Sequence, residues 1–246
     1  MDHEQDAGPR AWYFGVTDET WRELFLRAGC ASVGWPEVDH DISSEYTHES
    51  IVAATRASES VHSRNPAIQL RKFAHEAAAG DVIVLKDGFR VHAADGWSGT
   101  GCIRAIGVID GEYTYADARE YYDAVPKAAA STTNTHHRSV RWEINFDEQL
   151  GGPFTPDVAL NQWMFDEFDA YPELREQIRA SRGLEEQLAA VEEYATDIAR
   201  SRGAANEPTV WIEKSYHNRD DREVSEWGLG EALWCPQTRT DGGSSV

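Results

Sequence analysis

Residues 102–115 read Cys-Ile-Arg-Ala-Ile-Gly-Val-Ile-Asp-Gly-Glu-Tyr-Thr-Tyr, and this stretch decides the fold. The run from Cys102 to Ile109 is apolar and rich in β-branched residues, which predicts a buried strand. Asp110-Gly111 is a turn pair, and the residues after it predict another strand over 112–115. Strands that follow one another so quickly indicate a sheet built mainly from local connections.

The segments on either side of this stretch extend the same pattern. One helix is predicted after a Thr17 cap and ends at Gly29, and another begins at Asn65-Pro66 and ends at Gly80. Further strands are predicted over residues 12–16, 31–35, 81–85 and 140–144. Five or more strands with two helices predict an α+β domain over residues 11–150, with a curved or closed sheet.

The rest of the chain changes character after the break at Gly151-Gly152-Pro153. A helical segment is predicted over 155–202, with apolar residues spaced to pack on another helix or on the first domain; these are Leu184, Leu188, Val191, Ala195 and Ile198. Packing on the chain's own core is the preferred alternative, because two heptads are few for a coiled coil. Residues 209–246 repeat the 23-residue tryptophan spacing of the N-terminus, which predicts the start of a second unit or a C-terminal tail.

Charge and composition indicate the environment in which the protein works. The chain carries 43 acidic against 23 basic residues, a formal net charge of −20, and has only four lysines beside nineteen arginines. Such an evenly acidic, lysine-poor chain is typical of a high-salt cytosol, where salt screens self-repulsion. The alternative is an acidic protein that avoids or mimics nucleic acid. No apolar run is long enough to cross a membrane, so we expect a cytoplasmic protein without a membrane partner.

Several familiar chemistries have no motif in the sequence. A P-loop, a G-x-G-x-x-G dinucleotide fingerprint and the zinc peptidase and deaminase motifs are absent. Three cysteines without C-x-x-C spacing do not indicate a disulfide framework or a zinc site, and the adjacent pair His136-His137 does not indicate a metal site. We therefore expect no cofactor, no metal and no catalysis, although spacing alone leaves a Ser/His/Asp triad open.

Tryptophans near strand ends and loops are the remaining chemical signal. Trp35 ends a predicted strand, Trp97 lies in a Gly/Asp/Ser loop, and Trp142 follows the basic cluster His136-His-Arg-Ser-Val-Arg141. Aromatic rings beside a few cations suit a flipped or single-stranded base, because the rings stack on the base and the cations contact phosphate. The alternative for each tryptophan is a packing role, and for Arg138 and Arg141 it is a solvated surface charge.

Five motifs occur in an order that resembles the EVE/PUA-like N-terminal domain of McrB-type restriction proteins. The motifs are Trp12-Tyr-Phe-Gly, Ser32-Val-Gly-Trp35, Gly80-Asp-Val-Ile-Val, Ile106-Gly-Val-Ile-Asp-Gly-Glu-Tyr-Thr-Tyr115 and His137-Arg-Ser-Val-Arg-Trp142. The resemblance covers about residues 11–146 and implies a PUA-like mixed β pseudo-barrel with flanking helices. Residues 211–236 likewise resemble the opening of a second EVE-like module, so the chain is expected to be either a fragment of a longer protein or a chain whose C-terminal tail has another role.

The resemblance also implies a site that holds an extruded, often methylated base. By position it implies a pocket of Trp35, Ser32, Gly34 and Trp142, and backbone contacts from His137, Arg138 and Arg141. We add Trp97 to the base-binding group because of its loop, since the family pattern does not include that loop.

Three functions follow as hypotheses. The first is a non-catalytic reader of a modified base, with DNA preferred to RNA, that serves a modification-dependent restriction system beside an ATPase, GTPase or nuclease subunit. The alternative is a protein-interaction or regulatory module that works through the helices of 156–202, using Leu184, Leu188, Val191 and Ile198. The third is an enzyme with an unrecognised site.

Overall fold

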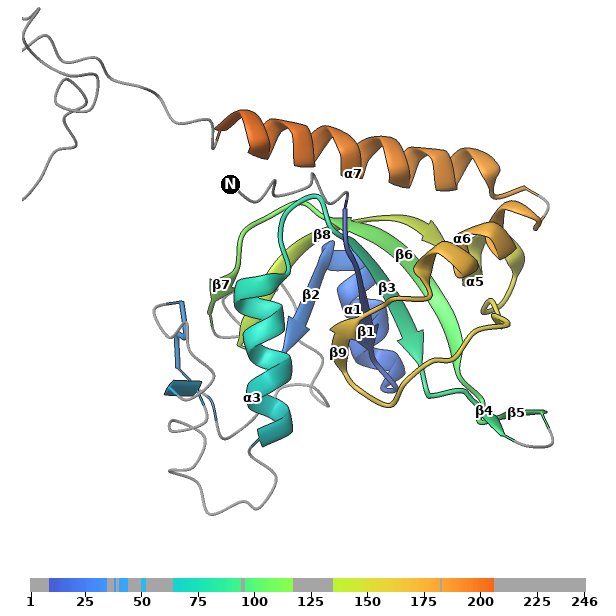
Figure 1. Cartoon of the computed structure of the whole chain (residues 1–246), viewed down its shortest axis with the longest axis horizontal. Helices are drawn as coiled ribbons and strands as arrows, with labels where there is room; N and C mark the ends of the chain where they lie inside the picture. Colours follow the sequence, from blue (N-terminus) through green and yellow to red (C-terminus); the bar gives the residue numbers. More distant parts are fainter. Residues whose placement is uncertain are drawn as a thin grey trace, which may run out of the picture. The chain divides into compact units, whose positions relative to one another are not determined.

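A computed structural model describes residues 9–34, 38, 40–43, 50–51, 64–93, 96–116, 135–181 and 183–205. These residues form one α+β unit around a seven-stranded sheet. The strand order is β2-β8-β6-β3-β1-β9, and β7 also pairs with β8. The predicted α+β class is confirmed, and the sheet curls into a half-barrel with helices on both faces (Figure 1). The expected second unit over 209–246 lies outside the described residues.

The N-terminal strand and helix form much as their residues predict. Strand β1 spans Ala11–Gly15 and helix α1 spans Glu19–Ala28. The N-cap of α1 is Asp18 and not the expected Thr17, because the Asp18 carboxylate accepts a hydrogen bond from the Trp21 amide at 3.0 Å. Gly29 ends α1 at a φ of 65°, a left-handed conformation that favours glycine. The next strand, β2, spans Cys30–Val33.

The middle of the sheet is made by three long strands. Strands β3 (Val82–Asp87), β6 (Cys102–Ile109) and β8 (His136–Asn145) lie side by side in antiparallel pairs. Strand β1 pairs with β3 in parallel, so the sheet is mixed. Strand β8 begins four residues before the predicted start at Val140, and it therefore takes His136-His137-Arg138 into the sheet.

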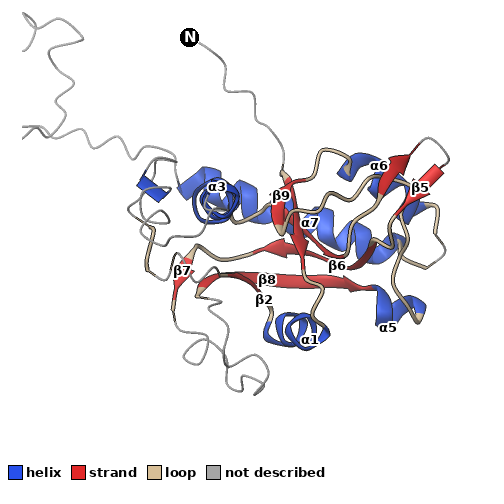
Figure 2. Ribbon diagram, turned by 90° about the horizontal axis from the view of Figure 1, so that it is seen from below, coloured by secondary structure: helices blue, strands red, loops and turns tan. Residues whose placement is uncertain are grey.

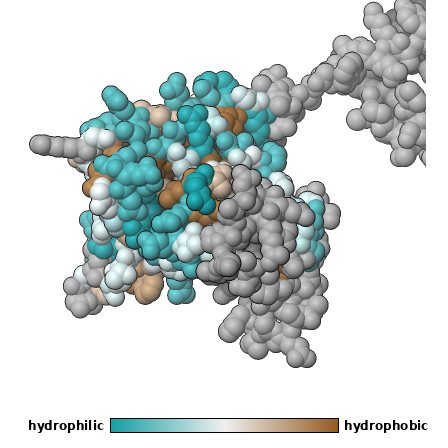
Figure 3. Space-filling view, turned by 180° about the vertical axis from the view of Figure 1, so that it is seen from behind, coloured by the Kyte–Doolittle hydropathy of each residue, from teal (hydrophilic) through white to brown (hydrophobic). Residues whose placement is uncertain are grey.

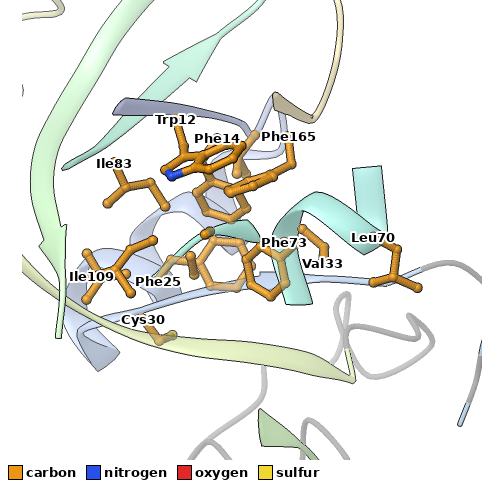
Figure 4. Close-up of a cluster of buried hydrophobic side chains, with 14 of the residues drawn as sticks. Trp12, Phe14, Phe25, Cys30, Val33, Leu70, Phe73, Ile83, Ile109 and Phe165 are labelled. Carbon is orange, nitrogen blue, oxygen red and sulfur yellow. The ribbon is translucent and has the colours of Figure 1, made fainter. Parts of the chain in front are cut away.

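The inner face of the curl carries an aromatic core. Trp12 and Phe14 of β1 point to this face, and the Trp12 ring stacks on Phe165 at 5.2 Å between ring centroids (Figure 4). Phe25 of α1 and Phe73 complete the core from the helical side. Phe73 lies in the π-helical turn Lys72–Glu76, which continues helix α3, Arg64–Arg71.

The outer face of the same strands carries a second core. Tyr13, Val84 and Val108 alternate with the inner residues and pack against helices α6 (Tyr171–Arg179) and α7 (Glu185–Ala205). Figure 2 shows α1 on one side of β6 and β8, and α6 and α7 on the other. The strands are apolar on both faces because helices cover both faces.

The segment 155–202 is therefore part of the same unit, and it is not wholly helical. Strand β9, Phe165–Glu167, pairs antiparallel with β1 at the edge of the sheet. Of the residues predicted to line the apolar face of the helix, Leu184, Leu188, Val191 and Ala195 are buried in the outer core, and Ile198 packs partly against it. These residues pack on the chain's own sheet, which is the alternative that the sequence favoured.

Besides β9, three short elements were not predicted from the sequence. Strands β4 (Val91–Ala93) and β5 (Gly96–Ser98) form a separate hairpin, and helix α5 spans Phe146–Leu150. The two-residue strand β7, Thr114–Tyr115, is shorter than predicted. None of the helices in the described part of the chain is long and apolar enough to cross a membrane. The face seen in Figure 3 is largely hydrophilic where it is described, as the net charge leads one to expect.

Lys86 is a buried cation at the end of β3. Its ammonium group donates hydrogen bonds to the carbonyl oxygens of Asn161 at 2.7 Å and Gly88 at 3.3 Å, and lies 5.7 Å from the centroid of the Tyr13 ring. Burial lowers the pKa of Lys86 from 10.5 to about 8, and the nearby Asp87 opposes this shift. The folded protein therefore holds the Lys86 proton less tightly than the unfolded chain does.

This difference in proton affinity predicts that the protein becomes more stable as the pH rises above 8, and that the gain depends on Lys86. Between pH 8 and pH 10.5 the unfolded chain binds more protons at Lys86, so the contribution of Lys86 to the free energy of unfolding rises with pH. From pH 7.5 to pH 9.5 we expect wild type to gain about 2 kcal/mol relative to Lys86→Met. Urea unfolding of both proteins at each pH measures this gain. If the free energies of unfolding of wild type and Lys86→Met differ by the same amount at both pH values, the lowered pKa of Lys86 is contradicted.

Candidate nucleic-acid interface

Three strands meet at one end of the sheet. Strand β8 pairs with β2 on one side and with β7 on the other, so that Ser32 and Thr114 both lie opposite His137. Directly opposed residues on neighbouring strands project to the same face. We call this end the β2–β7–β8 junction and define it by Ser32, Gly34, Tyr113, Tyr115, His136 and His137.

His137 is held by two hydrogen bonds to uncharged groups. Its Nδ1 lies 2.6 Å from the Ser32 hydroxyl oxygen, and its Nε2 lies 3.0 Å from the carbonyl oxygen of Ala116. A carbonyl oxygen only accepts, so Nε2 carries the proton. In the neutral ring Nδ1 then accepts from the Ser32 hydroxyl. This is not the arrangement of a Ser/His/Asp triad, because the far ring nitrogen meets a carbonyl and not a carboxylate.

His136 is held in the same way on the opposite face of β8. The Tyr113 hydroxyl lies 2.7 Å from Nδ1, and Nε2 lies 3.0 Å from the carbonyl oxygen of Val38. The Tyr113 ring is stacked on the imidazole at 5.9 Å, and Tyr115 is tilted against it at 5.4 Å. Burial raises the pKa of Tyr113, which keeps its hydroxyl protonated as a donor.

Burial differs sharply among these residues. His136 and His137 are fully buried, and Ser32 is 3% exposed. Gly34, Tyr113 and Tyr115 are only partly buried. The two histidines therefore form the buried part of the junction, one on each face of β8, and Tyr113 and Tyr115 supply its partly accessible surface on the His136 face.

Arg138, expected to contact a phosphate backbone, has a different place. Its side chain is 2% exposed and donates three hydrogen bonds to main-chain carbonyl oxygens: to Phe73 at 2.7 Å, to Ala74 at 2.9 Å and to Gly111 at 3.2 Å. Burial lowers the pKa of Arg138 to about 10, which still leaves it charged at neutral pH. Its guanidinium holds β8 to the π-helical turn, so it is not available to a ligand in this structure.

Trp142 and Arg141 lie farther along β8, on opposite faces. The Trp142 indole donates to the carbonyl oxygen of Phe25 at 3.1 Å and packs against the inner core. The Arg141 guanidinium lies 4.3 Å from the centroid of the Tyr194 ring on α7 and pairs with Glu143 at 2.5 Å. A strand rises about 3.3 Å per residue, which puts Trp142 roughly 20 Å from His136. The structure thus does not bring Trp142 or Arg141 to the junction.

The other two expected tryptophans are Trp35 and Trp97. Trp35 lies outside the described residues, directly after Gly34 in the chain. The backbone of Trp97 lies in β5, opposite His92. Figure 1 places the β4–β5 hairpin at the other end of the molecule from β7. Of the expected site residues, the structure therefore brings together Ser32, Gly34 and His137, and it places the Trp97 backbone elsewhere.

The sequence did not predict Tyr113 or Tyr115 as site residues, and it indicated His136 only as part of the basic cluster of residues 136–141. Tyr113 and Tyr115 are two residues apart, as are strand residues that share a face, and this spacing was the signal available for them. No group of three or more His, Cys, Asp or Glu residues is placed to hold a metal ion in the part of the chain that the structure describes.

Comparison with known proteins gives one family match, and its range includes the junction. Residues 14–151, more than half of the chain, match the family described as a domain of unknown function, DUF8426. The matched range runs from within β1 to the residue after α5 and contains β2, β7 and β8 entirely. A search of curated proteins gave no match. The chain belongs to the DUF8426 family.

Proposed function

We propose that this protein is a non-catalytic nucleic-acid reader that holds a flipped, modified base at the β2–β7–β8 junction. The observation that carries the proposal is the contact of the partly buried Tyr113 and Tyr115 with the buried, hydrogen-bonded His136. Strand β2, which pairs with β8 beside them, leads directly through Gly34 to Trp35 in the chain. Aromatic rings of this kind provide stacking surfaces for a base. The curled sheet is also compatible with the PUA/EVE-like pseudo-barrel that we propose for it.

The positions of the arginines affect how tightly such a reader would bind nucleic acid. Stacking contributes roughly 1–3 kcal/mol per base, while extrusion of the base costs a few kcal/mol. Arg138 is buried and Arg141 lies against Tyr194 of α7, so neither is placed to supply phosphate contacts at the junction. We therefore propose modest affinity that is concentrated on the modified base, with modified DNA preferred to RNA.

The wider setting is part of the same proposal. A module that recognises a base and does no chemistry needs a second component to act on the nucleic acid. We propose an ATPase, GTPase or nuclease subunit of a cytoplasmic restriction system as that component. The alternative, an interaction module working through the 156–202 helices, is less favoured because Leu184, Leu188 and Val191 are buried against the sheet.

A titration with labelled oligonucleotides in molar KCl tests the proposal. The probes are duplexes with 5-methylcytosine or N6-methyladenine, the unmodified duplex, and RNA with N6-methyladenosine. Burying a methyl group contributes about 0.8 kcal/mol, so we expect about fourfold tighter binding of one modified probe over its unmodified match. Fluorescence anisotropy gives both dissociation constants.

Two variants and a matched control locate the binding. Trp35→Ala and Tyr115→Ala are expected to remove the preference for the modified probe. Trp97→Ala, on the hairpin at the other end of the molecule, is expected to retain it. Equal binding of every probe, or loss of the preference in Trp97→Ala alone, would contradict the proposed site.

A further inference from the structure

Three consecutive basic residues of β8 are buried in and beside the junction. His136 and His137 are fully buried, and Arg138 follows them. Both ring nitrogens of each histidine already contact an uncharged group, a hydroxyl and a main-chain carbonyl. A buried arrangement of this kind is built for the neutral imidazole.

Protonation at Nδ1 disturbs both hydrogen bonds to the hydroxyls. In the neutral state the Ser32 and Tyr113 hydroxyls donate to Nδ1 of His137 and His136. An imidazolium ring is a donor at both nitrogens, so each hydroxyl must turn its proton to another acceptor or separate from the ring. These two hydroxyls come from β2 and from the segment before β7, so the change acts on both neighbours of β8.

The charges around His136 determine how unfavourable its protonated ring is. Arg138 lies two residues after His136 on the same face of β8, roughly 7 Å along the strand, and repels a second cation. Tyr113 and Tyr115 face His136, and the segment that contacts it through Val38 also carries His40 and Asp41.

Other ionisable groups surround His137 and Arg138. On the His137 side, β2 carries Cys30 two residues before Ser32. The charges of Glu112 and Asp81 act on Arg138. These two carboxylates therefore partly offset the repulsion that Arg138 exerts on a protonated histidine.

We propose that the His136–His137 pair is an acid switch that opens the β2–β7–β8 junction when either ring is protonated, and that opening releases the bound base. Release of the base rests on the proposed function, whereas opening of the junction does not. His136 lies under the tyrosines and His137 lies on the opposite face of β8, and both are fully buried. The switch therefore acts by moving the strands that carry the accessible surface.

Hydrogen exchange of the full chain tests the opening, at pH 7.5 and pH 5.0 with rates corrected for intrinsic exchange. We expect protection of residues 30–34, 113–116 and 135–139 to fall about tenfold at pH 5.0. Protection in α7 should change less than about twofold. Equal protection of the junction at both pH values, or equal loss in α7, would overturn the proposal.

The double variant His136→Gln/His137→Gln serves as the non-titrating protein, because a glutamine amide both donates and accepts. It should keep junction protection at pH 5.0, whereas His92→Gln, at an exposed histidine of β4, should behave as wild type. Acid opening that persists in the double variant would overturn the switch. If the double variant does not fold, Tyr113→Phe decides instead: removing one hydroxyl should move the midpoint of opening, and an unchanged midpoint would overturn the proposal.

Binding at the same two pH values separates the two proposals. Loss of modified-probe binding at pH 5.0 in wild type and in His92→Gln, together with acid opening of the junction in both, supports release by the switch. Acid opening in a protein that binds no probe at any pH supports the switch and contradicts the reader. Probe binding that is the same at both pH values contradicts release by the switch and leaves the reader supported.

Discussion

Arg138→Met is expected to lower the free energy of unfolding by about 3–5 kcal/mol. The guanidinium is buried and donates to three main-chain carbonyl oxygens, those of Phe73, Ala74 and Gly111. Methionine fills much of the same volume but donates no hydrogen bond, so these buried acceptors lose their partners. An unsatisfied buried polar group costs about 1–3 kcal/mol, and the loss of several together gives the expected range.

The matched control lies three residues later on the same strand. Arg141→Met removes an arginine whose side chain is 54% exposed and which contacts Tyr194 and Glu143. Surface contacts of this kind contribute about 1 kcal/mol or less. Chemical denaturation of both variants, in the same salt as wild type, gives the comparison. If Arg141→Met is as destabilising as Arg138→Met, the structural role of Arg138 is wrong.

Trp12→Ala is expected to be similarly destabilising, by about 3–5 kcal/mol. The Trp12 side chain is fully buried, stacks on Phe165, and donates from its indole nitrogen to Asp81 at 2.8 Å. Truncation leaves a cavity at the centre of the inner core and deprives the buried Asp81 carboxylate of a donor. Figure 4 shows the ring lying among the residues that would surround this cavity.

Two further variants separate the cavity from the hydrogen bond. Trp12→Phe keeps most of the ring volume but lacks the indole donor, so it should lose about 1–3 kcal/mol. Trp163→Ala removes a partly buried tryptophan and should be less destabilising than Trp12→Ala. Thermal or urea unfolding of the set measures the order. A Trp12→Ala protein as stable as Trp163→Ala would contradict the description of the inner core.

Local patterns predicted much of the fold because they depend on neighbouring residues. Gly29 ends α1, and the runs of apolar, β-branched and aromatic residues in β1, β3 and β6 predicted strands correctly. Strand β8 was placed too late because His136, His137 and Arg138 are polar and look like a surface segment. Their burial depends on partners such as Phe73 and Ala74, more than 60 residues away in the chain. No local pattern contains that information.

The site was harder to predict for the same reason. Adjacent strand residues point to opposite faces, so Arg141 and Trp142 could not line one site, and the period of two was already sufficient to say so. Strand β9 could not be found because three residues, Phe-Asp-Glu, carry no periodic signal. The place of Tyr113 beside His136 depends on the register of β7 against β8, which only the folded chain determines.

The central claim is that the β2–β7–β8 junction holds the base, and a hydrogen-exchange footprint tests it most directly. The full chain is compared at pH 7.5 in molar KCl, alone and saturated with the tightest-binding modified oligonucleotide. We predict slower exchange at residues 30–34 and 113–116, with α6, α7 and the β4–β5 hairpin unchanged. Slower exchange confined to α7 or to that hairpin, with none at the junction, would contradict the account.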